Sequence, residues 1–77
     1  MYEIYVSKIN RNMTSAKETR VKHTFYTLEE AMEKIEKIVA EIEEKESVEQ
    51  ITKWPNAVEV SFNDRLHTQL LFEVIDA

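Results

Sequence analysis

A single apolar stripe along a predicted helix constrains the fold of this chain more than any other sequence feature. Between residues 28 and 42 the apolar side chains recur at i, i+3, i+4 and i+7, which aligns them on one side of a helix of about five turns. The stripe consists of Leu28, Ala31, Met32, Ile35, Ile38, Val39 and Ile42. Thr27 and Glu30 form a capping box at its start, and the pattern fades through Lys45 and Ser47. Such a helix needs one apolar surface to lie on.

The residues before the helix predict two strands that can supply this surface. Tyr2–Ile9 and Thr19–Tyr26 alternate apolar and polar residues with the period of two that half-buried strands show. Their apolar face would contain Tyr2, Ile4, Val6, Val21, His23 and Phe25. The stretch Asn10–Arg20 holds the connecting loop, which is too long for a two-residue turn and uses Asn10 and Asn12 where glycine is common. We expect the two strands to pair as a hairpin.

The residues after the helix predict a second hairpin. Val58–Phe62 alternates as a strand, Asn63-Asp64 is suited to a tight turn, and Arg65–Ile75 is a long strand with apolar residues on both faces. The segment Val48–Trp54 alternates only weakly, so it is either a short strand or an irregular connection. Pro55-Asn56 ends it.

Together these elements predict a small α+β domain. The 77 residues form a single domain, because a chain of this length cannot divide its core in two. We predict the order β-β-α-β-β, with an antiparallel sheet of four or five strands and one amphipathic helix packed on one face as a second layer. The absence of cysteine leaves hydrophobic packing, helped by self-association, to stabilise the domain.

The composition excludes several kinds of chemistry. Without glycine there is no P-loop and no dinucleotide fingerprint, and without cysteine there is no thiolate nucleophile. His23 is expected at the edge of the core and His67 on the opposite strand face, so the two cannot share a metal ion. Seven of the fifteen acidic residues lie on the predicted helix, on its water-facing side, where nothing would desolvate a carboxyl group. We therefore predict a non-catalytic protein with no cofactor, metal site or small-molecule substrate.

The charge is unevenly distributed along the chain. The net charge is -5, yet residues 1–26 carry five cations and two acids, whereas the remaining residues are acidic. An acidic surface disfavours non-specific binding of nucleic acid and gives no reason to expect a membrane partner. No signal peptide or apolar span is visible, so we expect a cytoplasmic protein. The Lys-, Glu- and Ile-rich composition suggests an origin in a mobile element or phage.

The face of the sheet that the helix leaves open is the first candidate site. It would carry apolar and aromatic residues among Lys22, Gln69 and Glu73. The predicted interface residues are Tyr5, Tyr26, Leu71 and Ile75, together with Trp54. Small monomers rarely leave such a patch bare, so the pattern predicts a protein partner or a homodimer. The alternative is that these are scattered exposed hydrophobic residues of no functional meaning.

The basic N-terminal hairpin is the second candidate site. Its cations could contact a phosphate backbone while tyrosines stack on bases. The candidate contact residues are Arg11, Lys17, Arg20 and Lys22, within the region Lys8 to Lys22. A solvated loop is the favoured explanation, because the chain lacks an RNP-like motif and is acidic overall. A further variant is that the Glu-rich helix mimics nucleic acid and occupies a basic site on another protein.

Overall fold

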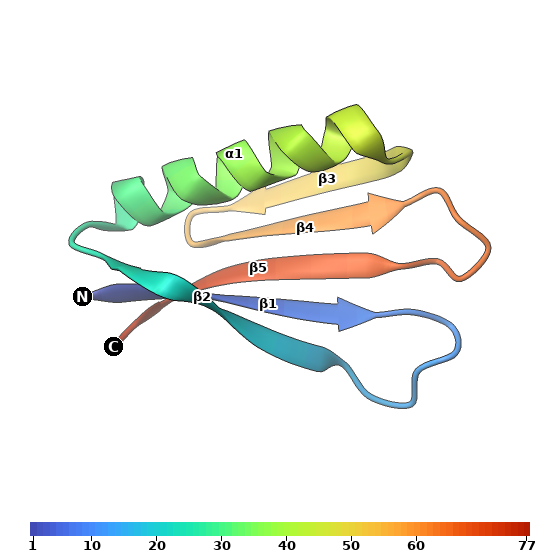
Figure 1. The fold of residues 1–77 in the computed structure, drawn as a ribbon, viewed down its shortest axis with the longest axis horizontal. Coiled ribbons are helices and arrows are strands. Elements are labelled where there is room, and N and C mark those ends of the chain that lie inside the picture. Colours follow the sequence, from blue (N-terminus) through green and yellow to red (C-terminus); the bar gives the residue numbers. More distant parts are fainter.

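The structure, a computed structural model that describes residues 1–77, is a five-stranded antiparallel sheet with one helix across one face (Figure 1). The elements are β1 (Tyr2–Ile9), β2 (Lys17–Phe25), α1 (Leu28–Lys45), β3 (Val48–Trp54), β4 (Ala57–Phe62) and β5 (Gln69–Asp76). The strand order is β2-β1-β5-β4-β3, so the last strand inserts between the two hairpins. The predicted two-layer α+β fold is confirmed, and the sheet has five strands.

Helix α1 begins and ends as its sequence predicts. The Thr27 hydroxyl oxygen accepts a hydrogen bond from the Glu30 amide at 3.1 Å, which satisfies one of the free N–H groups of the first turn. At the other end the Glu46 amide donates to the Ile42 carbonyl at 2.8 Å. Acidic residues in the first turn and Lys45 in the last complement the helix dipole.

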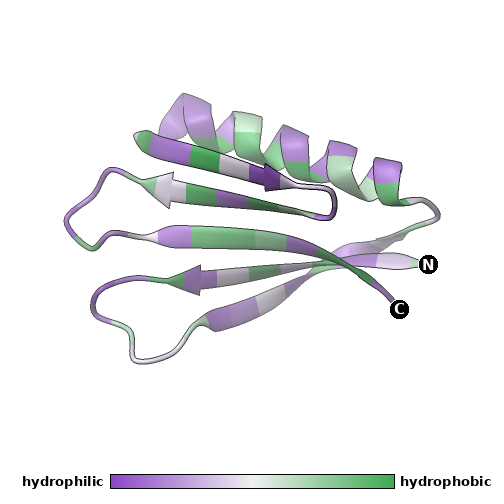
Figure 2. Cartoon of the chain, turned by 180° about the vertical axis from the view of Figure 1, so that it is seen from behind, coloured by the Kyte–Doolittle hydropathy of each residue, from purple (hydrophilic) through white to green (hydrophobic).

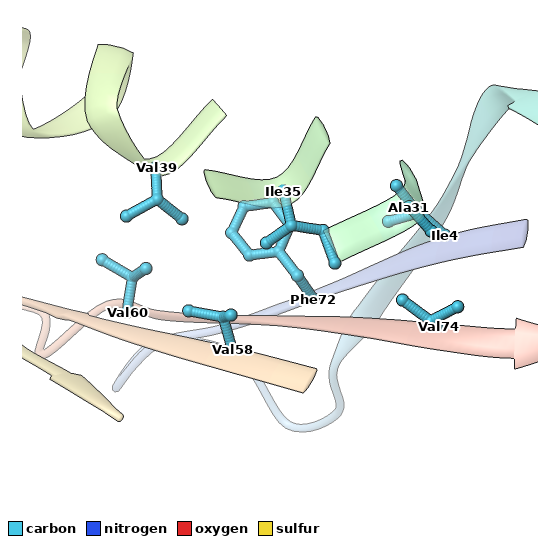
Figure 3. Close-up of a cluster of buried hydrophobic side chains, with 8 residues drawn as sticks. All are labelled: Ile4, Ala31, Ile35, Val39, Val58, Val60, Phe72 and Val74. Atoms are coloured by element: carbon cyan, nitrogen blue, oxygen red, sulfur yellow. The ribbon is translucent and has the colours of Figure 1, made fainter. Parts of the chain in front are cut away.

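The core is one layer of apolar side chains between α1 and the sheet. Its eight buried members come from the helix, β1, β4 and β5: Ile4, Ala31, Ile35, Val39, Val58, Val60, Phe72 and Val74. Figure 3 shows Ile35 and Val39 extending from the helix toward Phe72, Val58 and Val60 on the sheet. The predicted stripe is confirmed, since its remaining members pack partly buried around this layer.

Segment Val48–Trp54 is an edge strand and not an irregular connection, the alternative that the sequence left open. It pairs along its length with β4, from Val48 opposite Phe62 to Trp54 opposite Ala57. The register shifts between Val48 and Gln50, where Glu49 is an extra residue. This bulge changes the phase of the alternation, which explains why the period of two is weak in the sequence.

The connection between β4 and β5 differs from the prediction. The prediction of a tight turn at Asn63-Asp64 is wrong. Residues 63–68 form a wider loop, and β5 begins at Gln69 rather than Arg65. The side chain of Asp64 closes this loop by accepting a hydrogen bond from the Thr68 amide at 2.9 Å. His67 is therefore an exposed loop residue with the only positive φ in the chain, 52°, and not a strand residue.

Strand β2 also differs from its predicted bounds. It runs from Lys17 to Phe25, so Tyr26 lies beyond it in the bend that leads to α1. Opposite Ile4 the register shifts, and residues 21–23 together span the space that one residue occupies on β1. His23 lies within this bulge and is exposed, so its predicted place at the edge of the core was wrong.

The one-sided core predicts different costs for two isoleucines. Ile35 is fully buried, whereas Ile75 on the uncovered face is 42% exposed. Ile35→Ala should lower the free energy of unfolding by about 2–5 kcal/mol, because it leaves a cavity in the only apolar layer. Ile75→Ala should cost less than about 1 kcal/mol. Urea denaturation followed by circular dichroism measures both values, and equal losses would contradict the placement of the core.

Candidate functional site

The helix-free face is a surface built from all five strands that no other element covers (Figure 1). It is formed by the side chains that alternate with the buried ones, and the strand register identifies them. They are Glu3, Tyr5, Ser7, Ile9, Glu18, Arg20, Thr24, Gln50, Thr52, Trp54, Ala57, Glu59, Ser61, Gln69, Leu71, Glu73 and Ile75. Figure 2 shows the longest hydrophobic stretch in the middle of β5, between more hydrophilic flanking strands. The centre of the sheet is therefore apolar on both faces.

Three of the predicted interface residues lie together on this face. Tyr5 on β1 is directly opposite Glu73 on β5, so it is diagonal to both Leu71 and Ile75. Diagonal neighbours on adjacent strands are about 7–8 Å apart, within reach of an aromatic ring. The sheet thus assembles an apolar cluster from residues that are more than sixty positions apart in the chain.

The other two predicted interface residues lie outside this cluster. Trp54 is on the same face, but Ala57 and Glu73 separate it from Tyr5 by three strand spacings, about 14 Å. It forms a separate apolar site at the β3 edge. Tyr26 is 79% exposed in the bend after β2 and belongs to no strand. The helix-free face therefore contains four of the five predicted residues.

Half of the exposed large hydrophobic side chains lie on this face. Of six large hydrophobic residues that are exposed, three occupy strand positions of the helix-free face, namely Ile9, Trp54 and Ile75. The other three lie at the N-terminus or in loops: Met1, Tyr26 and Leu66. Tyr5 and Leu71 are half-buried only by their strand neighbours. A flat partner surface on this face would remove Tyr5, Leu71 and Ile75 from water together.

Both edge strands are poorly suited to pairing with another strand. The β2 edge carries the bulge at residues 21–23, and the β3 edge carries the bulge at Glu49. Bulges bend an edge and interrupt its row of free backbone groups, which discourages strand addition. The face of the sheet is therefore a better binding surface than either edge.

The basic hairpin does not present its cations as one surface. Arg20 lies on the helix-free face, where its Nη1 atom is 2.6 Å from Oε2 of Glu3. Lys17 is directly opposite Lys8, and both lie on the other face of the sheet. Arg11 and Lys22 are exposed, in the loop and in the β2 bulge. One of the four candidate phosphate contacts is thus already ion-paired, and the other three are divided between the loop, the β2 bulge and the other face of the sheet.

A groove of about 320 Å³ opens at the end of the layer between α1 and the sheet. Its lining combines apolar and charged side chains: Lys8, Ile42, Glu46, Phe62, Asp64, Thr68 and Leu70. The Asp64 carboxylate accepts hydrogen bonds from Thr68, which lower its pKa below the usual 3.8. It therefore remains ionised near neutral pH and is not suited to act as a general acid there.

Sequence reasoning placed Glu73 on the helix-free face but missed Glu59 and the arrangement of the two. Glu59 is directly opposite Leu71, and Glu73 is directly opposite Tyr5, so these carboxylates alternate with the apolar cluster. Both are half-buried and neither has an ion-pair partner. Alternation places Glu59 and Glu73 on the outer face of their strands, but only the strand order shows that they are diagonal neighbours.

Comparisons with known proteins identify no relative. No family model matches the chain, and no curated protein or solved structure does either. The structure has no group of three or more His, Cys, Asp or Glu side chains placed to hold a metal ion. Its one helix is too polar to cross a membrane.

The lowered pKa of Asp64 predicts a specific effect of acid. Asp64→Asn keeps an oxygen that can accept from the Thr68 amide but has no charge. The ionised carboxylate is favoured in the folded state, so the wild type should melt at a higher temperature than this variant at pH 7. That advantage should be present above pH 3.8 and be lost as the pH falls through the lower folded pKa.

Thermal unfolding between pH 7 and pH 2 measures the difference. Glu44→Gln is the control, because it removes one exposed charge from α1 that has no hydrogen bond or ion pair. A difference between the wild type and Asp64→Asn that stays constant down to pH 2 would contradict the role of Asp64.

Proposed function

We propose that this chain is a small non-catalytic protein-interaction module that binds through its helix-free face. The observation that carries the proposal is the cluster of Tyr5, Leu71 and Ile75 on a face that no other element covers. Aromatic and aliphatic side chains surrounded by charged ones are typical of the centre of a protein interface. A second copy of the chain and a different protein are both candidate occupants.

The surface area supports this proposal. A folded monomer of 9.1 kDa is expected to expose about 4,900 Å². This chain exposes 5499 Å², and only ten of its 77 residues are buried. The excess of about 600 Å² is comparable with the roughly 800 Å² that each partner buries in a standard interface. Its slab shape of 38 × 27 × 20 Å leaves one broad side of the sheet in water.

The charge distribution gives nucleic-acid binding less support. A phosphate-binding surface needs several unpaired cations on one side of the molecule. Here Arg20 is paired with Glu3 on the helix-free face, whereas Lys17 lies on the helix-covered face of the sheet. We therefore keep the protein interface as the proposed function.

A matched pair of double variants tests the proposal. Tyr5→Ser with Leu71→Ser removes two residues from the centre of the helix-free face. Tyr26→Ser with Leu66→Ser removes the same residue types from exposed loops. We expect the first variant to lose a bound partner, with affinity reduced at least about tenfold, and the second to keep it.

Binding is measured by sedimentation velocity for the purified chain and by capture of proteins from cell extract on immobilised chain. Circular dichroism first establishes that both variants fold. The proposal would be overturned if neither assay detects a partner, or if both double variants lose the partner equally.

A further inference from the structure

The helix-free face has a strong imbalance of charge. Four acidic residues occupy its paired strand positions, Glu3, Glu18, Glu59 and Glu73, against the cation Arg20, while Lys22 lies in the bulge at the β2 edge. Glu3 is satisfied within the chain, because it accepts a hydrogen bond from the Tyr5 hydroxyl at 3.4 Å and pairs with Arg20. No comparable partner is present for the two carboxylates nearest the apolar cluster. These are Glu59 and Glu73.

The carboxylates of Glu59 and Glu73 lie within the proposed binding surface. Glu73 lies between Tyr5 and Ala57 across the strands, and Glu59 is directly beside Leu71. A partner that covers Tyr5 and Leu71 therefore also covers both carboxylates and removes water from them. Taking an unpaired carboxylate out of water is strongly unfavourable unless an opposite charge replaces the water.

A second copy of the chain does not supply that opposite charge. Two helix-free faces in contact would bring six unpaired carboxylates together, Glu18, Glu59 and Glu73 of each copy, while Arg20 of each copy is already paired with its own Glu3 and Lys22 lies at the β2 edge. The net charge of -5 on each copy adds a longer-range repulsion. The charge pattern thus favours a different occupant from the homodimer that the sequence alone suggested.

We propose that the occupant is a basic protein surface that combines an apolar anchor with two cationic side chains. This inference rests on the proposed function. The anchor packs against Tyr5 and Leu71, and the cations pair with Glu59 and Glu73. Glu59 and Glu73 are diagonal neighbours with Cα atoms about 7–8 Å apart, close to the spacing of residues two apart on a strand or four apart on a helix. Arginine suits this role, because its guanidinium pairs with a carboxylate through two hydrogen bonds.

The same carboxylates keep the free chain from associating with itself. Charged residues placed within an apolar surface oppose pairing with an identical surface and allow pairing with a complementary one. On this account the wild type is a monomer at micromolar concentration. Glu59→Gln with Glu73→Gln should self-associate, since the apolar cluster remains and the repulsion is removed.

Two amphipathic helical peptides test the sign of the partner's charge. Both have 14 residues with the same leucine face, and the polar positions are lysine in one and glutamate in the other. We expect the lysine peptide to bind at least about tenfold more tightly and to shift the NMR signals of Tyr5, Leu71 and Glu73. Glu59→Gln with Glu73→Gln should remove most of this preference. Glu33→Gln with Glu44→Gln on α1, the control with the same change in charge, should retain it.

Each outcome separates this inference from the proposed function. Equal binding of both peptides at Tyr5 and Leu71 would overturn the basic partner while leaving the interface in place. A wild-type dimer in sedimentation velocity would do the same and identify the second copy as the occupant. A preference lost equally in both double variants would show non-specific attraction and overturn the inference. Absence of any binding at this face, with no protein captured from extract, would overturn both.

Discussion

The fold depends on a single apolar layer between α1 and one face of the sheet. Ile35 and Phe72 meet in this layer, and no second layer exists on the other side. A chain of 77 residues cannot build two cores, so covering one face leaves the other in water. The most apolar strand, β5, is central and takes part in both faces. The candidate interface is thus a direct consequence of the single core, which covers only one face of the sheet.

Side-chain hydrogen bonds and β-bulges stabilise the turns and bends of this chain, which has no glycine to provide them. Asp64 closes the loop before β5, and the backbone carbonyl of Leu66 in that loop accepts a hydrogen bond from the Arg11 amide at 2.7 Å. The Asn63 amide donates to the Ser47 carbonyl at 3.0 Å. One loop therefore joins the first hairpin to the connection between α1 and β3. No buried polar side-chain atom lacks a partner.

Local patterns predicted most of the fold, and long-range pairing explains the rest. The period of the helix and the alternation around Ile4 and Phe72 are readable over a few residues, so those elements were predicted well. The β3 bulge at Glu49 and the Asp64 loop were missed because each depends on a partner segment that the local pattern does not reveal. For the site, alternation identified Tyr5 and Leu71, whereas the diagonal pair Glu59 and Glu73 required the strand order.

Solvent access on the two sides of β5 tests the central claim most directly. Leu71 and Phe72 are consecutive residues on opposite faces of the same strand, and Phe72 is only 2% exposed. Hydroxyl-radical footprinting of the monomeric chain, normalised to the intrinsic reactivity of each residue type, measures their accessibility side by side. The account predicts that Leu71 is modified several-fold faster than Phe72. Equal protection of both residues would mean that the second face is also covered, and would contradict the one-sided fold.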